Sequence, residues 1–283
     1  MKQLTLLPQK DYGKLYFFLK DECFSESLIS ALRKSENAMK INGVPVNMRS
    51  KIKAGDKVEI AFRDEKATAL KECDLPLEIL FENEDLLVVN KPAGLPTIPS
   101  RSHFDVNLAG AVAKYMSVKK ENFVFRALGR LDKDTSGVVI IAKNQYAAGM
   151  TTFKKTYLAL CHGEIKEKTF SINAPILTEQ ENNINAQKRV TSAQGKSATT
   201  HAKVLKTFNG KSLLELTLEQ GRTHQIRVHL SSLGHPLVGD SVYGSGDAPR
   251  TMLHAYKAEI TLPSKEQINI TAPLPDDFLK QIS

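Results

Sequence analysis

Four features that mark common classes of protein are absent or scarce in this sequence of 283 residues. It has no apolar run of about 18 residues, so we expect no membrane span. Its start lacks the long apolar stretch of a secretory signal, which predicts a cytoplasmic protein. The three cysteines lie far apart, as expected of reduced thiols rather than of a disulfide framework. No Cys-x-x-Cys pair is present to form a zinc site.

The composition is that of a globular protein with excess positive charge. Hydrophobic residues make up 41% of the chain and charged residues 25%, and the length suits one large or two unequal domains. The net charge of +8 favours an anionic partner, with nucleic acid as the first candidate. A basic enzyme with a solvated surface would have the same composition. Residues 1–63 contain 12 lysines and arginines against seven acidic residues, which indicates a separate basic module.

The pattern within residues 1–63 predicts a small α/β domain. Ser25 can cap the second of two short helices, and Asn42-Gly43 is typical of a hairpin turn. Pro45 restricts the strand after that turn to a sheet edge. We predict helices near 15–19 and 28–32 and strands at 39–41, 44–46 and 58–62. This order resembles the small RNA-binding domain named after a protein of the small ribosomal subunit; a dimerisation or scaffold domain is the alternative.

Residues 64–76 are charged and predict a linker, after which residues 77–283 predict one larger domain. Helices are expected at 107–118 and 145–154, and a mobile loop at 192–200. Many strands and few helices predict an α+β fold with a large mixed or antiparallel sheet. The strands are predicted at 77–81, 86–90, 138–142, 157–161, 202–208, 212–218, 226–230 and 258–262.

The first candidate site is the charged turn from Gly129 to Gly137. Arg130 and Lys133 flank Asp132 and favour its carboxylate form, which can act as a nucleophile or a base. A surface turn with local ion pairs has the same composition. Asp132 and Asp134 are also a weak candidate for a divalent-metal pair, but the segment offers no third carboxylate.

The second candidate site lies between Glu219 and Leu230. On the predicted strand Gln225, Arg227 and His229 share one face, which indicates either a polar site or a solvated sheet face. His224 and His229 would lie on opposite faces of that strand, so a zinc pair is disfavoured. Tyr157 heads a third segment and is either a core tyrosine or a ring that stacks on a nucleobase.

Together these segments resemble the RluA-type pseudouridine synthase family over residues 77–278. The matching motifs follow one another in the order of that family. They are Val88–Gly94, Arg130–Asp132 with Thr135–Gly137, Tyr157–Ala159 with Gly163, Gly221–His229, Gly234–Pro236 with Gly239-Asp240 and Tyr243-Gly244, Leu253–Ala255, and Ala272–Pro275.

The resemblance implies roles for individual residues. Asp132 matches the essential aspartate, Tyr157 the tyrosine that lies against the target base, and Arg227 the arginine that pairs with the aspartate. Arg130 matches a residue that, in some members, helps to fill the gap left by the flipped nucleotide. Arg222, His224 and Lys91 would contact RNA or support the structure.

The implied reaction is the isomerisation of uridine to pseudouridine in RNA. It breaks the bond between uracil N1 and C1′, turns the ring and bonds C5 to C1′, so neither a cofactor nor a metal is expected. Asp132 would attack C1′ or remove the C2′ proton, and the uridine would first flip out of its stack. We expect ribosomal RNA as the substrate, with transfer RNA next, and a monomeric enzyme.

Three positions depart from the family pattern. Gly129 stands where many members have histidine, and Gln220 where threonine is common. The connection between 144 and 155 is shorter than usual. Two other functions remain open for the sequence alone: a non-catalytic RNA-binding or ribosome-assembly factor of the same fold, and a metal-dependent hydrolase built on Asp132, Asp134 and histidines.

Overall fold

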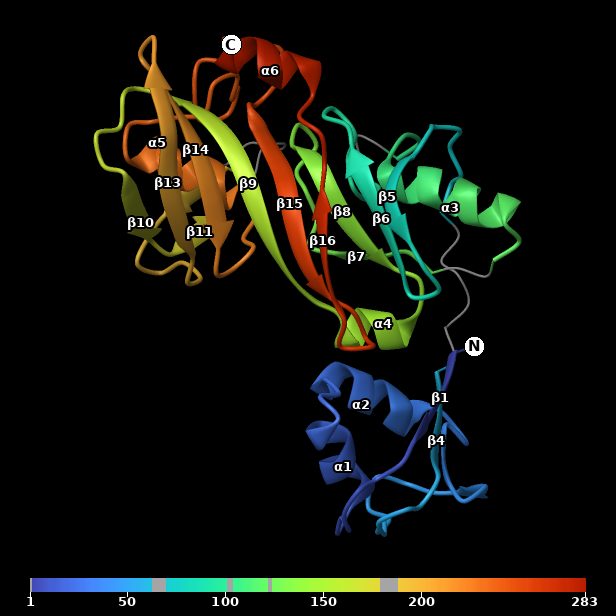
Figure 1. The fold of residues 1–283 in the computed structure, drawn as a ribbon. Helices are drawn as coiled ribbons and strands as arrows, with labels where there is room; N and C mark the ends of the chain where they lie inside the picture. Colours follow the sequence, from blue (N-terminus) through green and yellow to red (C-terminus); the bar gives the residue numbers. More distant parts are fainter. Residues whose placement is uncertain (1, 63–69, 101–103, 122–123, 179–187) are drawn as a thin grey trace.

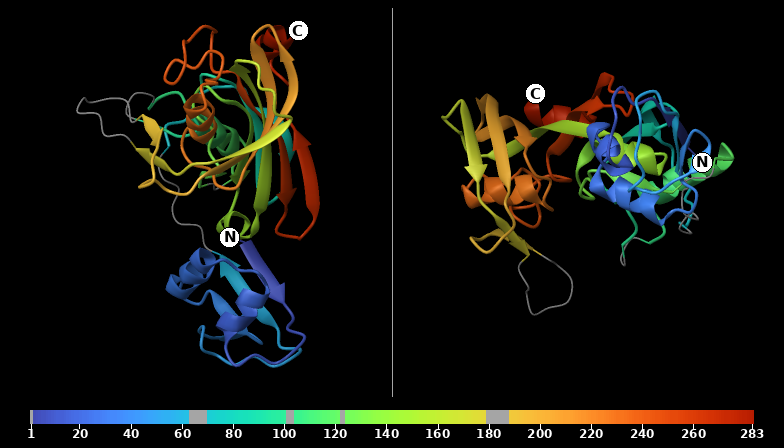
Figure 2. Two further views of the ribbon diagram at one scale, coloured as in Figure 1. Left: turned by 90° about the vertical axis from the view of Figure 1, so that its left-hand side faces the viewer. Right: turned by 90° about the horizontal axis from the view of Figure 1, so that it is seen from below.

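The chain forms a small N-terminal unit and a larger body built around one long sheet (Figure 1). This computed structural model describes residues 2–62, 70–100, 104–121, 124–178 and 188–283. The small unit lies below the larger body in Figure 1 and in the left view of Figure 2. Of the linker expected at 64–76, residues 64–69 lie outside the described residues. Residues 70–76 form neither helix nor strand.

The N-terminal unit has two helices packed on a four-stranded sheet of order β1-β4-β2-β3. The Ser25 side chain accepts a hydrogen bond from the Leu28 amide and caps the second helix. Pro45 lies on the edge strand, where its missing N–H costs no sheet hydrogen bond. The elements are β1 (Lys2–Leu6), α1 (Leu15–Asp21), α2 (Glu26–Lys34), β2 (Met39–Ile41), β3 (Val44–Pro45) and β4 (Val58–Phe62).

The core of this unit is completed by a residue from the larger body. Tyr146, on the short helix α4 (Gln145–Met150), joins the buried cluster and lies against Phe24 and Phe62, with ring centroids 6.0 and 5.3 Å away. Gly149 on the same helix lies against Leu28. The two parts of the chain therefore share an apolar contact at the 144–155 connection.

The described residues of the larger body form an α+β domain around a ten-stranded sheet, which confirms the predicted fold class. Eight follow the order β10-β13-β14-β9-β15-β8-β6-β5, while β16 pairs with β15 and β7 with β8. Among the described residues only β8 and β15 pair in parallel. The strands are β5 (Glu78–Glu82), β6 (Leu86–Lys91), β7 (Arg126–Leu128), β8 (Ser136–Ala142), β9 (Thr152–His162), β10 (Thr169–Asn173), β13 (Thr199–Phe208), β14 (Lys211–Leu218), β15 (Leu253–Thr261) and β16 (Gln267–Thr271).

The centre of the sheet is buried on both faces. Every residue of β8 is buried, and Val139 and Ile141 pack with α3 (Leu108–Val118) on one face. Val138 and Ile140 pack with β16 and α4 on the other. A β-branched run of this kind is what a doubly covered strand requires. The Asn107 side chain caps α3 by accepting from the Gly110 amide.

The prediction of a strand at 226–230 is wrong, because this segment belongs to the helix α5 (Gln225–Ser232). All six residues from 225 to 230 are buried. Ile226 and Leu230 face the apolar core, while Gln225 and His229 bond to Thr199, Thr200 and Ala174 on neighbouring segments. The alternation of polar and apolar residues predicted a strand with one solvated face. The polar side chains are instead buried in a helix, where they bond to partners distant in sequence.

Other boundaries also differ from the prediction. The helix expected at 145–154 ends at Met150, because β9 begins at Thr152, five residues earlier than predicted. Part of the loop expected at 192–200 belongs to β13. The remaining elements are α6 (Asp276–Ile282) and a two-stranded ribbon of β11 (Ile176–Thr178) and β12 (Arg189–Thr191).

The shared contact makes Tyr146→Ala a test of how the two parts are held together. Tyr146 is 8% exposed, and truncation of a buried aromatic ring costs about 3 kcal/mol. We expect urea denaturation to show a loss of that size. Phe104→Ala, at a side chain that is 60% exposed, should change the free energy of unfolding by less than about 0.5 kcal/mol. If Tyr146→Ala changed the free energy of unfolding as little as Phe104→Ala does, the contact would be contradicted.

The junction of β8 and β15 predicts a pH-dependent stability. His254 is fully buried; Ser136 Oγ donates to its Nδ1 and its Nε2 donates to the Ala272 carbonyl. Burial lowers the pKa of His254 to about 4. The folded state therefore keeps it neutral while the unfolded chain binds a proton below pH 6.5, so stability falls as the pH drops from about 6.5 towards 4.

By pH 5 this loss amounts to about 2 kcal/mol, as measured by urea denaturation against pH 7.5. His254→Gln should lack that part of the decline, whereas the exposed His201→Gln should retain it. Parallel pH curves for the wild-type protein and His254→Gln would show that His254 is not responsible.

Candidate active site at the Asp132 turn

Asp132 lies in a tight turn between β7 and β8, beside a buried anchor. The Thr135 amide donates to the Asp132 carbonyl, which closes the turn. The neighbouring Leu131 is buried in the core under α3. Thr97 Oγ1 donates to the Leu131 carbonyl at 2.7 Å and accepts from the Leu131 amide at 3.3 Å. These contacts fix the backbone from which the Asp132 side chain projects.

Lys91 holds the other side of the turn. Its ammonium is buried and donates to the carbonyls of Lys133, Pro92 and Leu95 at 2.7–3.0 Å. Three acceptors match the three donors of an ammonium group. Burial lowers the pKa of Lys91 to about 7, while the charges of Asp134 and Asp132 oppose that shift. Of the two roles expected for Lys91, this position favours structural support over contact with RNA.

Arg227 is oriented by a second carboxylate that the sequence analysis left without a role. Its Nε and Nη2 donate to the two oxygens of Asp240 at 2.7 and 2.8 Å. Asp240 is fully buried and also accepts from the Val242 and Tyr243 amides. Burial opposes its ionisation, but the hydrogen bonds and charge of Arg227 hold its pKa below the usual value. The pair is thus a bidentate, charge-assisted contact.

The backbone at Gly239 places Asp240. Gly239 has φ +74°, and a Cβ there would lie 2.0 Å from the Arg250 carbonyl oxygen. Only glycine fits this position without displacing the backbone. The motif Gly239-Asp240 was visible in the sequence, but its role depends on the distant Arg227.

With two nitrogens bound to Asp240, Arg227 presents its third to Asp132. Arg227 Nη1 lies 3.5 Å from Asp132 Oδ2, and His224 Nε2 lies 3.9 Å from the same oxygen. The start of α5 therefore brings both residues to the turn: Arg227 lies in the helix and His224 is its N-cap residue. A strand was predicted for this segment. The guanidinium and the carboxylate therefore face each other at the end of the cavity.

Tyr243 orients His224. The Tyr243 hydroxyl accepts from the Arg189 amide at 2.9 Å and lies 3.0 Å from His224 Nδ1. With that hydroxyl donating to Nδ1, the proton of the neutral ring is on Nε2, which faces Asp132. Burial lowers the pKa of His224, against the charge of Asp132. Tyr243 also lies under the Arg227 guanidinium, 5.2 Å from ring centroid to Cζ.

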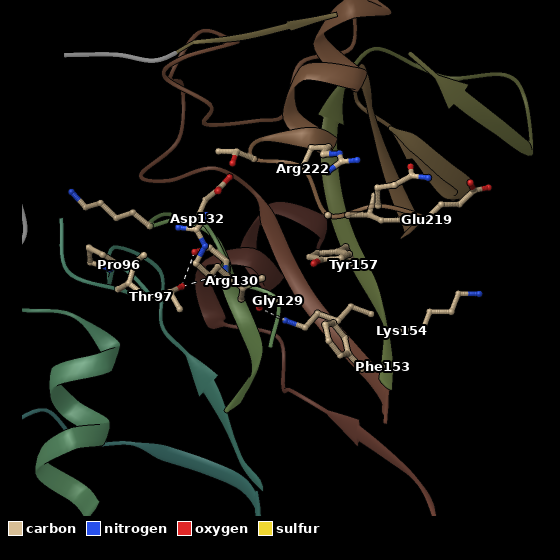
Figure 3. Close-up of a pocket in the computed structure, with 18 residues that line it drawn as sticks. Pro96, Thr97, Gly129, Arg130, Asp132, Phe153, Lys154, Tyr157, Glu219 and Arg222 are labelled. Carbon is tan, nitrogen blue, oxygen red and sulfur yellow. Dashed lines mark hydrogen bonds between the residues drawn. The ribbon is translucent and has the colours of Figure 1, made fainter. Parts of the chain in front are cut away.

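A cavity of about 450 Å³ opens beside this cluster (Figure 3). Asp132, Tyr157 and Arg130 line it together with Arg222. Burial and the charge of Asp132 raise the pKa of Tyr157, so its hydroxyl stays protonated. Arg130 and Arg222 are exposed at the rim, and Arg222 Nε donates to the Ser197 carbonyl. The volume suits a small planar ligand such as a nucleobase.

Two features are absent from the part of the chain that the structure describes. There, no group of three or more His, Cys, Asp or Glu side chains is arranged to hold a metal ion. Within the same ranges, no helix has the length and apolar character needed to cross a bilayer.

Comparison with known proteins gives one consistent result. The family model described as RNA pseudouridylate synthase matches residues 85–232. The uncharacterized RNA pseudouridine synthase YhcT of Bacillus subtilis is 38% identical over 86% of this chain and 84% of its own. The ribosomal large subunit pseudouridine synthase D of Nitrosomonas europaea is 34% identical over 96% of this chain and 80% of its own.

A solved structure agrees with these sequence relatives. The human RNA pseudouridylate synthase domain containing 1 is 31% identical, with a TM-score of 0.58, over 71% of this chain and 84% of its own.

The buried pair predicts that Asp240→Asn destabilises the protein. The substitution leaves the Arg227 charge buried without its partner, which typically costs about 3–5 kcal/mol. Because the pKa of Asp240 is lowered in the folded protein, its contribution is complete at pH 7 and disappears as the pH falls below about 4. Urea denaturation at both pH values measures the difference. The exposed Asp74→Asn is the matched control; equal stability of the two variants at pH 7 would refute the role of the pair.

Proposed function

Since the chain belongs to the RNA pseudouridylate synthase family and isomerises uridine to pseudouridine in RNA, we propose that Asp132 is its catalytic residue and that ribosomal RNA is its substrate. The observation that carries the assignment of Asp132 is its position at the cavity, with the free Nη1 of an Arg227 already fixed by Asp240 directed at its carboxylate.

The reaction needs an ionised carboxylate and no net oxidation or reduction. The bond between N1 and C1′ breaks, the uracil turns, C5 bonds to C1′, and the proton lost from C5 is balanced by one gained at N1. Asp132 starts this sequence by attacking C1′ or by removing the C2′ proton. Arg227 directs the carboxylate in either case.

Tyr157 and Arg130 act on the base and on the space that it leaves. A uridine within a stack or duplex must flip out before Asp132 reaches its ribose. Tyr157 lines the cavity, where its ring can stack on the flipped uracil. Arg130 is exposed at the rim and can occupy the vacated position in the RNA. Arg222, with its guanidinium at the same rim, is suited to a phosphate.

Ribosomal RNA is proposed as the substrate because of the relatives and the N-terminal unit. Several relatives are named ribosomal large subunit pseudouridine synthase D. Residues 1–63 carry five of the eight excess positive charges, so we propose that this unit binds the RNA and that residues 77–283 act on it. Transfer RNA is the next candidate. Because one chain brings Asp132, Tyr157 and Arg227 together, we propose a monomer as the working form. We also propose that it acts in the cytoplasm.

The test is the reaction of purified Asp132→Asn with transcribed large-subunit ribosomal RNA. Removal of the charge should lower pseudouridine formation by at least about a thousandfold, while RNA affinity stays near that of the wild-type protein. Pseudouridine-specific chemical sequencing gives the yield and the site.

Asp134→Asn, two residues along the same turn, is the matched control and should keep most of the activity. If Asp132→Asn remained fully active, the catalytic assignment would be wrong. If the wild-type protein bound ribosomal RNA without modifying it, the non-catalytic alternative would be favoured.

A further inference from the structure

A second aromatic ring faces the cavity from the strand that carries Tyr157. Side chains on a strand alternate between faces, so Phe153, Lys155 and Tyr157 lie on one face of β9. All three line the cavity, and Figure 3 shows the rings of Phe153 and Tyr157 in succession along the strand. Four residues of extended chain separate their Cα atoms by about 13 Å.

The ring of Phe153 lies where a side chain at position 129 would be, and this sequence has glycine there. A Cβ on Gly129 would lie 2.9 Å from Phe153 Cζ, too close for an ordinary contact. Gly129 also has φ +74°, a conformation that residues with side chains rarely adopt. The glycine that stands where many family members have histidine thus makes room for the Phe153 ring in the cavity that Asp132 also lines.

The ring is held in place and still accessible. Lys155 is buried, and its Nζ donates to the Gly129 carbonyl at 3.0 Å and lies 5.7 Å from the Phe153 centroid. Gly129 and Lys155 therefore contact the ring, yet Phe153 remains 38% exposed. A large aromatic side chain that is fixed and partly exposed loses little freedom when a flat ligand stacks on it.

The surroundings point to nucleic acid as that ligand. Exposed basic residues border the same cavity: Arg130, Lys133, Lys154 and Arg222. An aromatic ring for the base and nearby cations for the phosphates are the two elements of single-stranded nucleic-acid binding sites.

We infer that Phe153 is a stacking platform for a nucleobase adjacent or close to the target uridine in the RNA. The uridine itself occupies the Tyr157 end of the cavity, and the second base lies at the Phe153 end. This inference rests on the proposed function and extends it to a second subsite. Every base has a flat face, so the platform selects an unpaired neighbour rather than a particular sequence.

Two substitutions separate stacking from simple packing. Phe153→Leu keeps an apolar side chain against Gly129 but removes the flat face, whereas Phe153→Trp keeps an aromatic face. The probe is a short transcript around the uridine that the wild-type enzyme modifies in ribosomal RNA. Single abasic nucleotides replace, one at a time, the three positions on each side of that uridine.

On the intact transcript, Phe153→Leu should lower kcat/KM by about 5- to 150-fold, the range for loss of one base–aromatic stack. Phe153→Trp should keep most of the wild-type value. On the transcript that is abasic at the stacked position, the wild-type enzyme should fall to the value of Phe153→Leu, and the two should no longer differ. Both variants should unfold within a few degrees of the wild-type protein.

Three results would overturn the inference. The first is an equal kcat/KM for the wild-type enzyme and Phe153→Leu on the intact transcript. The second is a deficit of Phe153→Leu that stays the same on all six abasic transcripts. The third is a kcat/KM of Phe153→Trp as low as that of Phe153→Leu. Turnover of the intact transcript by the wild-type enzyme tests the proposed function separately, so its failure would not be confused with failure of the subsite.

Discussion

The candidate site depends on one buried ion pair, between Arg227 on α5 and Asp240 in the loop that follows it. Two of the three guanidinium nitrogens are bound by Asp240, so the third has a fixed direction, and that direction is toward Asp132. A flexible arginine could neutralise the same carboxylate but would not aim it. Because burying two charges is costly, the pair is better explained by this orienting role than by stability.

The opposite wall of the site is fixed in a different way. Lys91 and Thr97 hold the carbonyls on either side of Asp132, and Leu131 anchors the turn in the core under α3. Asp132 thus has a rigid backbone and a side chain that is 26% exposed toward the cavity. Preorganised geometry of this kind lets a single carboxylate act without rearrangement during the reaction.

Much of this architecture could be predicted from local sequence patterns. The β-branched run at 138–142 and the helix after Asn107 depend on their own residues, so both predictions were confirmed. The α5 helix could not be predicted, because its polar residues are buried against partners far away in sequence. The role of Asp240 could not be predicted for the same reason. Nor could the packing of Phe153 on Gly129, which lie 24 positions apart in the sequence.

The central claim is that this protein forms pseudouridine in cells through Asp132. Site-resolved pseudouridine mapping of total RNA tests it most directly, in cells that lack the gene and are supplied with either the wild-type protein or Asp132→Asn. The account predicts a modification in ribosomal RNA that disappears on deletion and returns only with the wild-type protein. Identical pseudouridine maps in all of these cells, or restoration by Asp132→Asn, would contradict it.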